Sequence, residues 1–121
     1  NPFEAGIDSF VRLDKDDFIG RDAALRLAQQ PLGESRVTWT VDAGSAMVWG
    51  DEAVYREGER VGYVTSGGYG AHVDADIALG YVRPDAIDAT AEYAIEILGE
   101  MRPARLQTEP LYDTQGARMR A

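Results

Sequence analysis

The sequence of 121 residues contains no cysteine, and this absence excludes several kinds of site at once. Disulfide bonds, thiolate zinc sites, iron–sulfur clusters and a cysteine nucleophile all need that side chain. A chain without cysteine also fits a reducing compartment. The length corresponds to one domain, and 45% apolar residues are enough to build a packed core.

Basic residues are scarce, twelve against 21 acidic ones, which gives a net charge of −9. A field of this sign repels phosphate backbones and anionic membranes, so we expect neither nucleic acid nor a membrane as a partner. No apolar run approaches the roughly 18–20 residues that cross a bilayer. The first residue is Asn1 and not Met, and the opening residues resemble the interior of a longer sequence. We therefore expect an excised fragment or a processed product that lacks the catalytic residues.

Local patterns predict one helix followed by short strands. Residues 21–30 are rich in Ala and Leu, with Asp22 in the first turn, and Pro31 ends this predicted helix. Ahead of it, residues 10–13 are predicted as a short strand. From Ser35 onward the apolar residues follow a period of two, which predicts strands over 37–41, 53–56, 60–65, 76–82, 92–98 and 101–108. The hairpin turn lies at 57–59, and about six short strands indicate a small sandwich or barrel.

Two of these stretches carry further expectations. Both alternating sets of residues 76–82 are apolar, so this strand is expected to be covered on both faces. Residues 66–70, Ser-Gly-Gly-Tyr-Gly, are predicted as a loop. A strand and no helix follows them, which makes a phosphate site a weak interpretation. Close packing of a chain segment or ligand would explain glycines at these positions.

The chemically interesting side chains form no self-contained active site. Residues 14–17 and 74–76 lack the glycine and glutamate of a calcium loop, so we expect no metal site. His72 and Ser66 have no evident partners for acid–base or nucleophilic chemistry. Trp39 lies in a clean alternating strand and is expected in the core. Trp49 lies in a loop, where an interface or ligand role and plain packing are about equally favoured.

Five ordered stretches resemble the C-terminal part of the glycine-cleavage T-protein (aminomethyltransferase) family. They are residues 2–7, 13–21, 62–70, 77–82 and 109–113, which match a Pro-x-Glu-Ala-Gly segment, an Asp-Phe-Ile-Gly-Arg segment, a Gly-x-Val-Thr-Ser-Gly hairpin, an Ile-Ala-Leu-Gly-Tyr-Val strand and the closing segment. The ordered set spans nearly the whole chain and is therefore specific. The Gly-Gly-Tyr-Gly sequence, Trp49-Gly50 and the Pro-Leu-Tyr-Asp ending look most like one branch, the folate-linked C-terminal region of flavin-dependent dimethylglycine and sarcosine dehydrogenases or oxidases.

The resemblance implies a mainly β fold, a small six-stranded antiparallel barrel preceded by one α-helix. Residues 1–33 would form the end of a folate-binding domain and a linker helix, 34–113 the barrel, and 114–121 a frayed tail. In such enzymes an FAD domain oxidises an N-methyl amine to an iminium, and a tetrahydrofolate domain captures the one-carbon unit. The barrel closes over the folate cavity. The family's catalytic Asp would precede Asn1, so no catalytic residue is expected in this chain, and the isolated chain is expected to be inactive.

The same resemblance supplies the remaining expectations. The cofactor-binding candidates are Lys15, Trp49, Gly67, Gly68, Tyr69 and Tyr112. Lys15 falls near a folate-contacting arginine of T-proteins, and Tyr112 is a candidate for their folate-contacting tyrosine near the chain end. The expected partners are the upstream folate and FAD domains and a methylated glycine substrate. The expected location is the bacterial cytoplasm or the mitochondrial matrix, and the cytoplasm is preferred. The alternatives are a stand-alone aminomethyltransferase or folate-dependent demethylase and, in another class, a non-enzymatic barrel that binds protein or small ligands.

Overall fold

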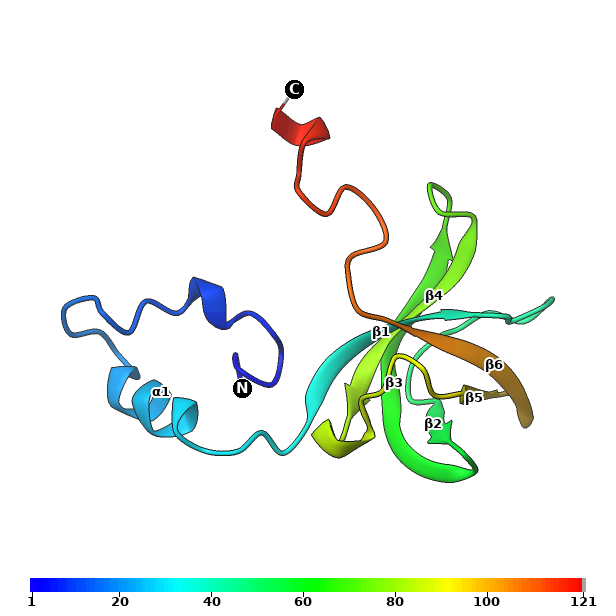
Figure 1. The fold of residues 1–121 in the computed structure, drawn as a ribbon, viewed down its shortest axis with the longest axis horizontal. Coiled ribbons are helices and arrows are strands. Elements are labelled where there is room, and N and C mark those ends of the chain that lie inside the picture. Colours follow the sequence, from blue (N-terminus) through cyan, green and yellow to red (C-terminus); the bar gives the residue numbers. More distant parts are fainter. Residues whose placement is uncertain (121) are drawn as a thin grey trace.

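The strands expected from the period-two pattern close into one barrel, shown in Figure 1. The computed structural model describes residues 1–120. The strands are β1 (Ser35–Val41), β2 (Ala53–Arg56), β3 (Glu59–Gly70), β4 (Ala75–Val82), β5 (Tyr93–Ile97) and β6 (Glu100–Gln107). Every pair is antiparallel, and the order is β1-β4-β3-β2-β5-β6, with β6 returning to β1. The mainly β fold, with a six-stranded antiparallel barrel preceded by one α-helix, is confirmed. Closure gives each strand two neighbours and leaves no open edge along the barrel wall.

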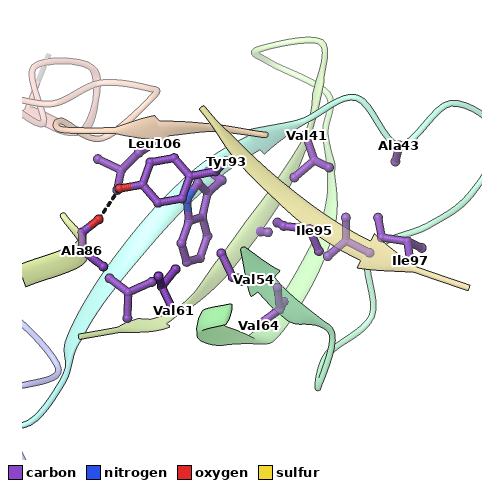
Figure 2. Packing of buried hydrophobic residues seen from close by; sticks show 14 residues of the cluster. Val41, Ala43, Val54, Val61, Val64, Ala86, Tyr93, Ile95, Ile97 and Leu106 are labelled. Atoms are coloured by element: carbon purple, nitrogen blue, oxygen red, sulfur yellow. Dashed lines mark hydrogen bonds between the residues drawn. The ribbon is translucent and has the colours of Figure 1, made fainter. Parts of the chain in front are cut away.

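The inward-facing side chains of the strands fill the inside of the barrel and form its core. Trp39 of β1 is fully buried, which confirms its expected core position. Its ring meets Tyr93 edge to face, with centroids 6.2 Å apart. The Tyr93 hydroxyl donates a hydrogen bond to the Ala86 carbonyl at 2.5 Å, drawn as a dashed line in Figure 2. The tyrosine therefore buries its ring and still satisfies its polar end.

Two hairpins use tight turns in which both central residues have positive φ. In the β2–β3 turn these are Glu57 (φ 52°) and Gly58 (φ 82°). The sequence predicts this hairpin with its turn at 57–59, whereas Glu59 is instead the first residue of β3. In the β5–β6 turn they are Leu98 (φ 51°) and Gly99 (φ 80°). Two-residue turns of this hand match the right-handed twist of the flanking strands. Leu98, which is 90% exposed, occupies a position that usually favours Asn, Asp or Gly.

The glycine-rich stretch 66–70 is not a loop, and that prediction is wrong. It forms the second half of β3 and pairs with β4 from Ser66 opposite Leu79 to Gly70 opposite Ala75. A bulge shifts the register between Val64 and Ser66, and the chain reverses only at 71–74. Glycine has a low intrinsic preference for strands, but pairing with β4 outweighs that local preference.

The N-terminal segment packs little against the barrel. The helix α1 (Arg21–Ala28) is confirmed, although it ends two residues before the predicted end, and none of its residues is buried. The predicted strand at 10–13 is wrong, because a 3-10 turn, η1 (Asp8–Phe10), takes its place and no strand pairs with the residues that follow. A strand needs a neighbour for its backbone groups, and the barrel closes without this segment.

The C-terminal segment also extends away from the barrel (Figure 1). A second 3-10 turn, η2 (Pro84–Ala86), follows β4, and a third, η3 (Arg118–Arg120), lies in the region predicted as a frayed tail. The Asp113 carboxylate accepts the backbone N–H of Ala117 at 2.8 Å and so supports this last turn. Ala121, the last residue of that predicted tail, lies outside the described residues.

Among residues 1–120, no helix has both the length and the apolar character that crossing a membrane requires.

Candidate functional site

The connection between β1 and β2 carries Trp49 at the surface and Val48 beneath it. Val48 is 2% exposed and belongs to the core, whereas the Trp49 side chain is 76% exposed. A Cβ on Gly67 would overlap the Val48 side chain, so the glycine allows this connection to pack directly on β3. The close approach expected at the glycines is thus made by a segment of this same chain.

Backbone contacts hold the Trp49 connection against β3. The Asp51 N–H donates to the Val64 carbonyl at 2.7 Å, and the Val64 N–H donates to the Glu52 carbonyl at 2.9 Å. The Glu52 side chain accepts the Trp49 N–H through Oε1 at 2.8 Å. Asp51 has φ 68°, a conformation that non-glycine residues seldom adopt. Trp49 is therefore an exposed aromatic ring on an ordered support.

The remaining β3 candidates divide between the two faces of the strand. Gly67 and Tyr69 share the face that meets Val48, because successive residues of a strand alternate. We name Trp49, Gly67 and Tyr69 together the aromatic surface. Gly68 points to the opposite face, and a Cβ built on it would meet no atom within 4 Å. Sequence reasoning named Gly67, Gly68 and Tyr69 together and did not separate their faces.

Tyr69 is 63% exposed, and its hydroxyl donates a hydrogen bond to the Asp74 carboxylate across the hairpin turn. This hydrogen bond, together with the negative charge of Asp74, raises the pKa of Tyr69 above its ordinary value of 10.0. The phenol therefore stays neutral at physiological pH. A neutral ring with a fixed hydroxyl can pack against a planar ligand, but it is a poor general base.

Tyr112 lies near the same hairpin, at the start of the C-terminal segment. Its ring packs against His72, with centroids 4.7 Å apart and planes tilted by 52°. The Arg118 guanidinium donates to the Tyr112 hydroxyl at 2.9 Å. Within residues 1–120 no hydrogen bond joins the His72 ring to a carboxylate, so the structure shows no oriented acid–base pair. No group of three metal-ligating side chains comes together in this part of the chain either.

Lys15 is the candidate that the fold does not bring to the others. It lies between η1 and α1, on the segment that extends to the far side of the molecule from the β3–β4 hairpin (Figure 1). Its loop is held by Arg21, whose Nη2 donates to the Leu13 carbonyl at 3.1 Å. Only a surface that spans the N-terminal segment and the barrel would meet both Lys15 and Trp49.

Sequence reasoning missed Val48 and Glu52, which position Trp49. Val48 looks like any apolar loop residue, and its contact with Gly67 depends on the fold. Glu52 is a surface-type residue by composition, yet its Oε2 is shielded from solvent without a hydrogen-bond partner in the described chain. An open groove of about 1090 Å³ lies elsewhere, over β5 and β6 with Tyr55 and Arg105 at its sides, and contains none of the predicted site residues.

Comparison with known proteins places the barrel in a family. Residues 35–113 match the glycine cleavage T-protein C-terminal barrel domain. The chain belongs to this family. This T-protein barrel begins with β1 and extends to Asp113, so the aromatic surface and Tyr112 lie within the matched residues.

Several relatives contain the T-protein barrel together with the N-terminal segment. Dimethylglycine dehydrogenase, mitochondrial, of Mus musculus is 35% identical over 121 residues, which is 99% of this chain and 14% of the mouse protein. The 4-methylaminobutanoate oxidase (formaldehyde-forming) of Paenarthrobacter nicotinovorans is 31% identical over 99% of this chain and 15% of its own length. An aminomethyltransferase of Parasynechococcus marenigrum is 37% identical over 92% of this chain and 30% of its own length. The chain thus spans between a seventh and a third of these relatives.

The crystal structure of glycine cleavage system aminomethyltransferase T from Bartonella henselae has the same fold, with a TM-score of 0.79. The superposition covers 94% of this chain and 32% of that protein, at 24% sequence identity. In these relatives the T-protein barrel and its lead-in are therefore one part of a larger polypeptide.

Proposed function

We propose that the chain is the C-terminal part of a tetrahydrofolate-dependent, aminomethyltransferase-like enzyme of the flavin-linked dimethylglycine or sarcosine dehydrogenase and oxidase kind. The observation that carries this proposal is the exposed Trp49, held on a rigid support beside Gly67. Support also comes from the relatives, because the dimethylglycine dehydrogenase alignment includes 99% of the chain. In this proposal the barrel closes the folate cavity of the preceding domain.

The aromatic surface suits a folate ring system. Trp49 and Tyr69 present exposed aromatic side chains on which a planar ligand can pack. The space beside Gly67 is filled by Val48, so the ligand would contact the two rings and not this glycine. Tetrahydrofolate, when bound, supplies the nitrogen atoms that accept a one-carbon unit. The Trp49 and Tyr69 side chains would cover the ring edge and keep water from a reactive one-carbon intermediate. Lys15 would meet the folate carboxylates only where the preceding domain bridges the two regions.

Residues 1–120 show no strand–turn–helix arrangement of the kind that holds a flavin dinucleotide. A dinucleotide needs a glycine-rich turn that leads from a strand into a helix N-terminus. Here the glycines at 67, 68 and 70 lie inside β3 and lead into β4. FAD therefore belongs to another part of the proposed parent enzyme, as does the catalytic carboxylate.

Substitution of Trp49 tests the proposal in the full-length protein. We expect Trp49→Ala to lower the yield of methylenetetrahydrofolate per amine oxidised while flavin reduction by substrate stays close to wild type. Leu98→Ala is the matched control, because Leu98 is a large exposed residue of a different turn. Equal losses in flavin reduction and folate-coupled transfer would contradict the proposed role.

A stand-alone aminomethyltransferase is the second candidate, favoured by the 37% identity to the Parasynechococcus marenigrum protein. The visible absorption spectrum of the purified full-length protein separates the two. Bound flavin supports the oxidoreductase, and a colourless protein that transfers an aminomethyl group supports the transferase.

A further inference from the structure

The N-terminal segment, residues 1–34, takes no part in the hydrophobic core. The buried cluster begins at Trp39, and the partly buried apolar side chains that pack on it begin at Val37. The helix α1 buries none of its residues. Burial of apolar surface, which normally holds one element on another, therefore does not fix this segment on the barrel. Its position depends on polar contacts.

Two of these polar contacts come from one residue at the start of β1, Arg36. Its backbone N–H donates to the Glu4 carbonyl at 2.8 Å. Its side-chain Nε donates to the Ala5 carbonyl, also at 2.8 Å, across 31 positions of sequence. The arginine therefore binds two consecutive peptide groups of the N-terminal segment. The contact from the guanidinium is charge-assisted, which makes it stronger than a hydrogen bond between neutral groups.

The Glu4 side chain closes the same junction from the opposite direction. Its Oε1 accepts the backbone N–H of Gly33 at 3.3 Å, and its Oε2 accepts the Asn1 Nδ2 at 2.7 Å. A Cβ on Gly33 would lie only 3.3 Å from Oε1, so the carboxylate reaches the chain where no side chain stands in the way. Arg36 thus holds the backbone of Glu4, while the Glu4 side chain holds the backbone of Gly33. We name Glu4, Ala5, Gly33 and Arg36 the clasp.

The clasp joins the two ends of a long excursion of the chain. Residues 6–32 leave the barrel and return to it between the two halves of the clasp, and they include η1, α1 and Lys15. Figure 1 shows the first residues of the chain beside the start of β1, with α1 farther out. A neighbouring contact is the Tyr63 hydroxyl, which donates to the Glu34 carboxylate at 3.2 Å. Within residues 1–120, the hydrogen bonds from the N-terminal segment to the strands are this contact and the two from the arginine.

We propose that the clasp fixes the N-terminal segment on the barrel, and that Arg36 is thereby a positioning residue for the Lys15 side of the folate site. This inference rests on the proposed function, in which Lys15 and Trp49 meet different parts of one folate. Such a ligand needs a constant separation between the two residues. The linker at 29–34 contains neither helix nor strand, so it does not supply that constancy by itself. Arg36 acts through the segment and not on the ligand, because its Nε is engaged by Ala5.

Amide hydrogen exchange of the full-length protein, measured without folate or substrate, tests the clasp. We expect Arg36→Ala and Glu4→Ala each to raise the exchange rate of peptides that cover residues 29–36 about tenfold. The double variant should exchange no faster than the faster single variant, because either substitution already opens the clasp. Arg60→Ala is the matched control, since Arg60 is an exposed arginine of β3 outside the clasp, and it should exchange like wild type.

Steady-state kinetics of the same proteins test the positioning role. Arg36→Ala should raise the KM for tetrahydrofolate about fivefold while flavin reduction by the amine substrate stays at the wild-type rate. A substitution that only destabilised the protein would lower both activities. Arg36→Lys should recover part of the KM, because its ammonium group can still donate to the Ala5 carbonyl.

Wild-type exchange rates in both single variants would overturn the proposal, and Glu4→Ala keeps this test available should Arg36→Ala fail to fold. A double variant that exchanges about a hundredfold faster would show two independent contacts and would also overturn the clasp. Faster exchange with an unchanged KM for tetrahydrofolate would overturn the positioning role of Arg36. A wild-type protein that uses no folate contradicts the proposed function, whereas faster exchange in its single variants still supports the clasp.

Discussion

The Val48 side chain occupies the space that a Cβ on Gly67 would need. This contact joins the β1–β2 connection to β3 and sets the position of the adjacent Trp49. It also distinguishes the two neighbouring glycines, because a Cβ on Gly68 would meet open space.

Gly67→Ala is therefore expected to destabilise the chain by about 1–3 kcal/mol, because the added methyl group displaces Val48. Gly68→Ala is the matched control and should change stability by less than about 0.5 kcal/mol. Denaturant unfolding of the two variants measures the difference. Equal denaturation midpoints for the two variants would show that the β1–β2 connection moves to accommodate the methyl group without loss of stability.

The two tryptophans should respond oppositely to truncation. Trp39 is fully buried against Tyr93, so Trp39→Ala should cost about 3–5 kcal/mol of stability through the cavity it leaves. Trp49 is 76% exposed, and Trp49→Ala should stay within about 0.5 kcal/mol of wild type. Thermal unfolding followed by circular dichroism checks both. A large loss for Trp49→Ala would mean that its ring packs within the barrel.

The Tyr69–Asp74 contact has a measurable pH signature. The phenol donates to the Asp74 carboxylate, which raises the pKa of Tyr69, because ionisation would place two negative oxygens in contact. Asp74→Asn should bring this pKa down toward 10.0. The stability that the contact contributes is present below pH 10.0 and is lost as pH rises through the raised pKa of folded Tyr69. An ultraviolet titration monitors the phenolate, with Tyr69→Phe to identify its share, and an unchanged curve in Asp74→Asn contradicts the contact.

Tyr112 should hold the C-terminal segment near the hairpin. Tyr112→Ala removes both the packing on His72 and the hydrogen bond from Arg118, and we expect trypsin to cleave after Arg118 several-fold faster. Tyr112→Phe keeps the ring and loses only the hydrogen bond, so its cleavage rate should fall between those of Tyr112→Ala and wild type. Identical rates in all three proteins would show that the tail opens independently of Tyr112.

Sequence patterns were most informative where local rules and the fold agree. The alternation around Trp39 predicts its burial, and Glu57-Gly58-Glu59 predicts a hairpin turn, which the structure shows as a two-residue turn at Glu57 and Gly58. The same reasoning failed at Phe10–Leu13 and at residues 66–70. Phe10–Leu13 has side chains that favour a strand, but no neighbouring strand lies beside it to pair with its backbone. Ser66–Gly70 has residues with a low preference for strands, yet it forms a strand because its backbone pairs with β4.

The candidate site shows the same division. Trp49 stands out as an aromatic residue in a connection, and the ordered motifs point to the T-protein family, which the match of residues 35–113 establishes. Val48 and Glu52 carry no local signal, because their roles depend on contacts with residues distant in the chain or on shielding from solvent. Lys15 has motif support, yet the structure places it apart from Trp49, so any joint role depends on what lies between them.

The sequence by itself determined the alternation of the strands, the β2–β3 hairpin, the burial of Trp39 and the family resemblance, because each depends on residue type at short spacing. The tertiary structure alone decided the strand order, the placement of glycines 67 and 68 on opposite faces and the Val48 contact. Those features depend on which backbone groups pair across the barrel, and pairing is settled by the closure of all six strands together.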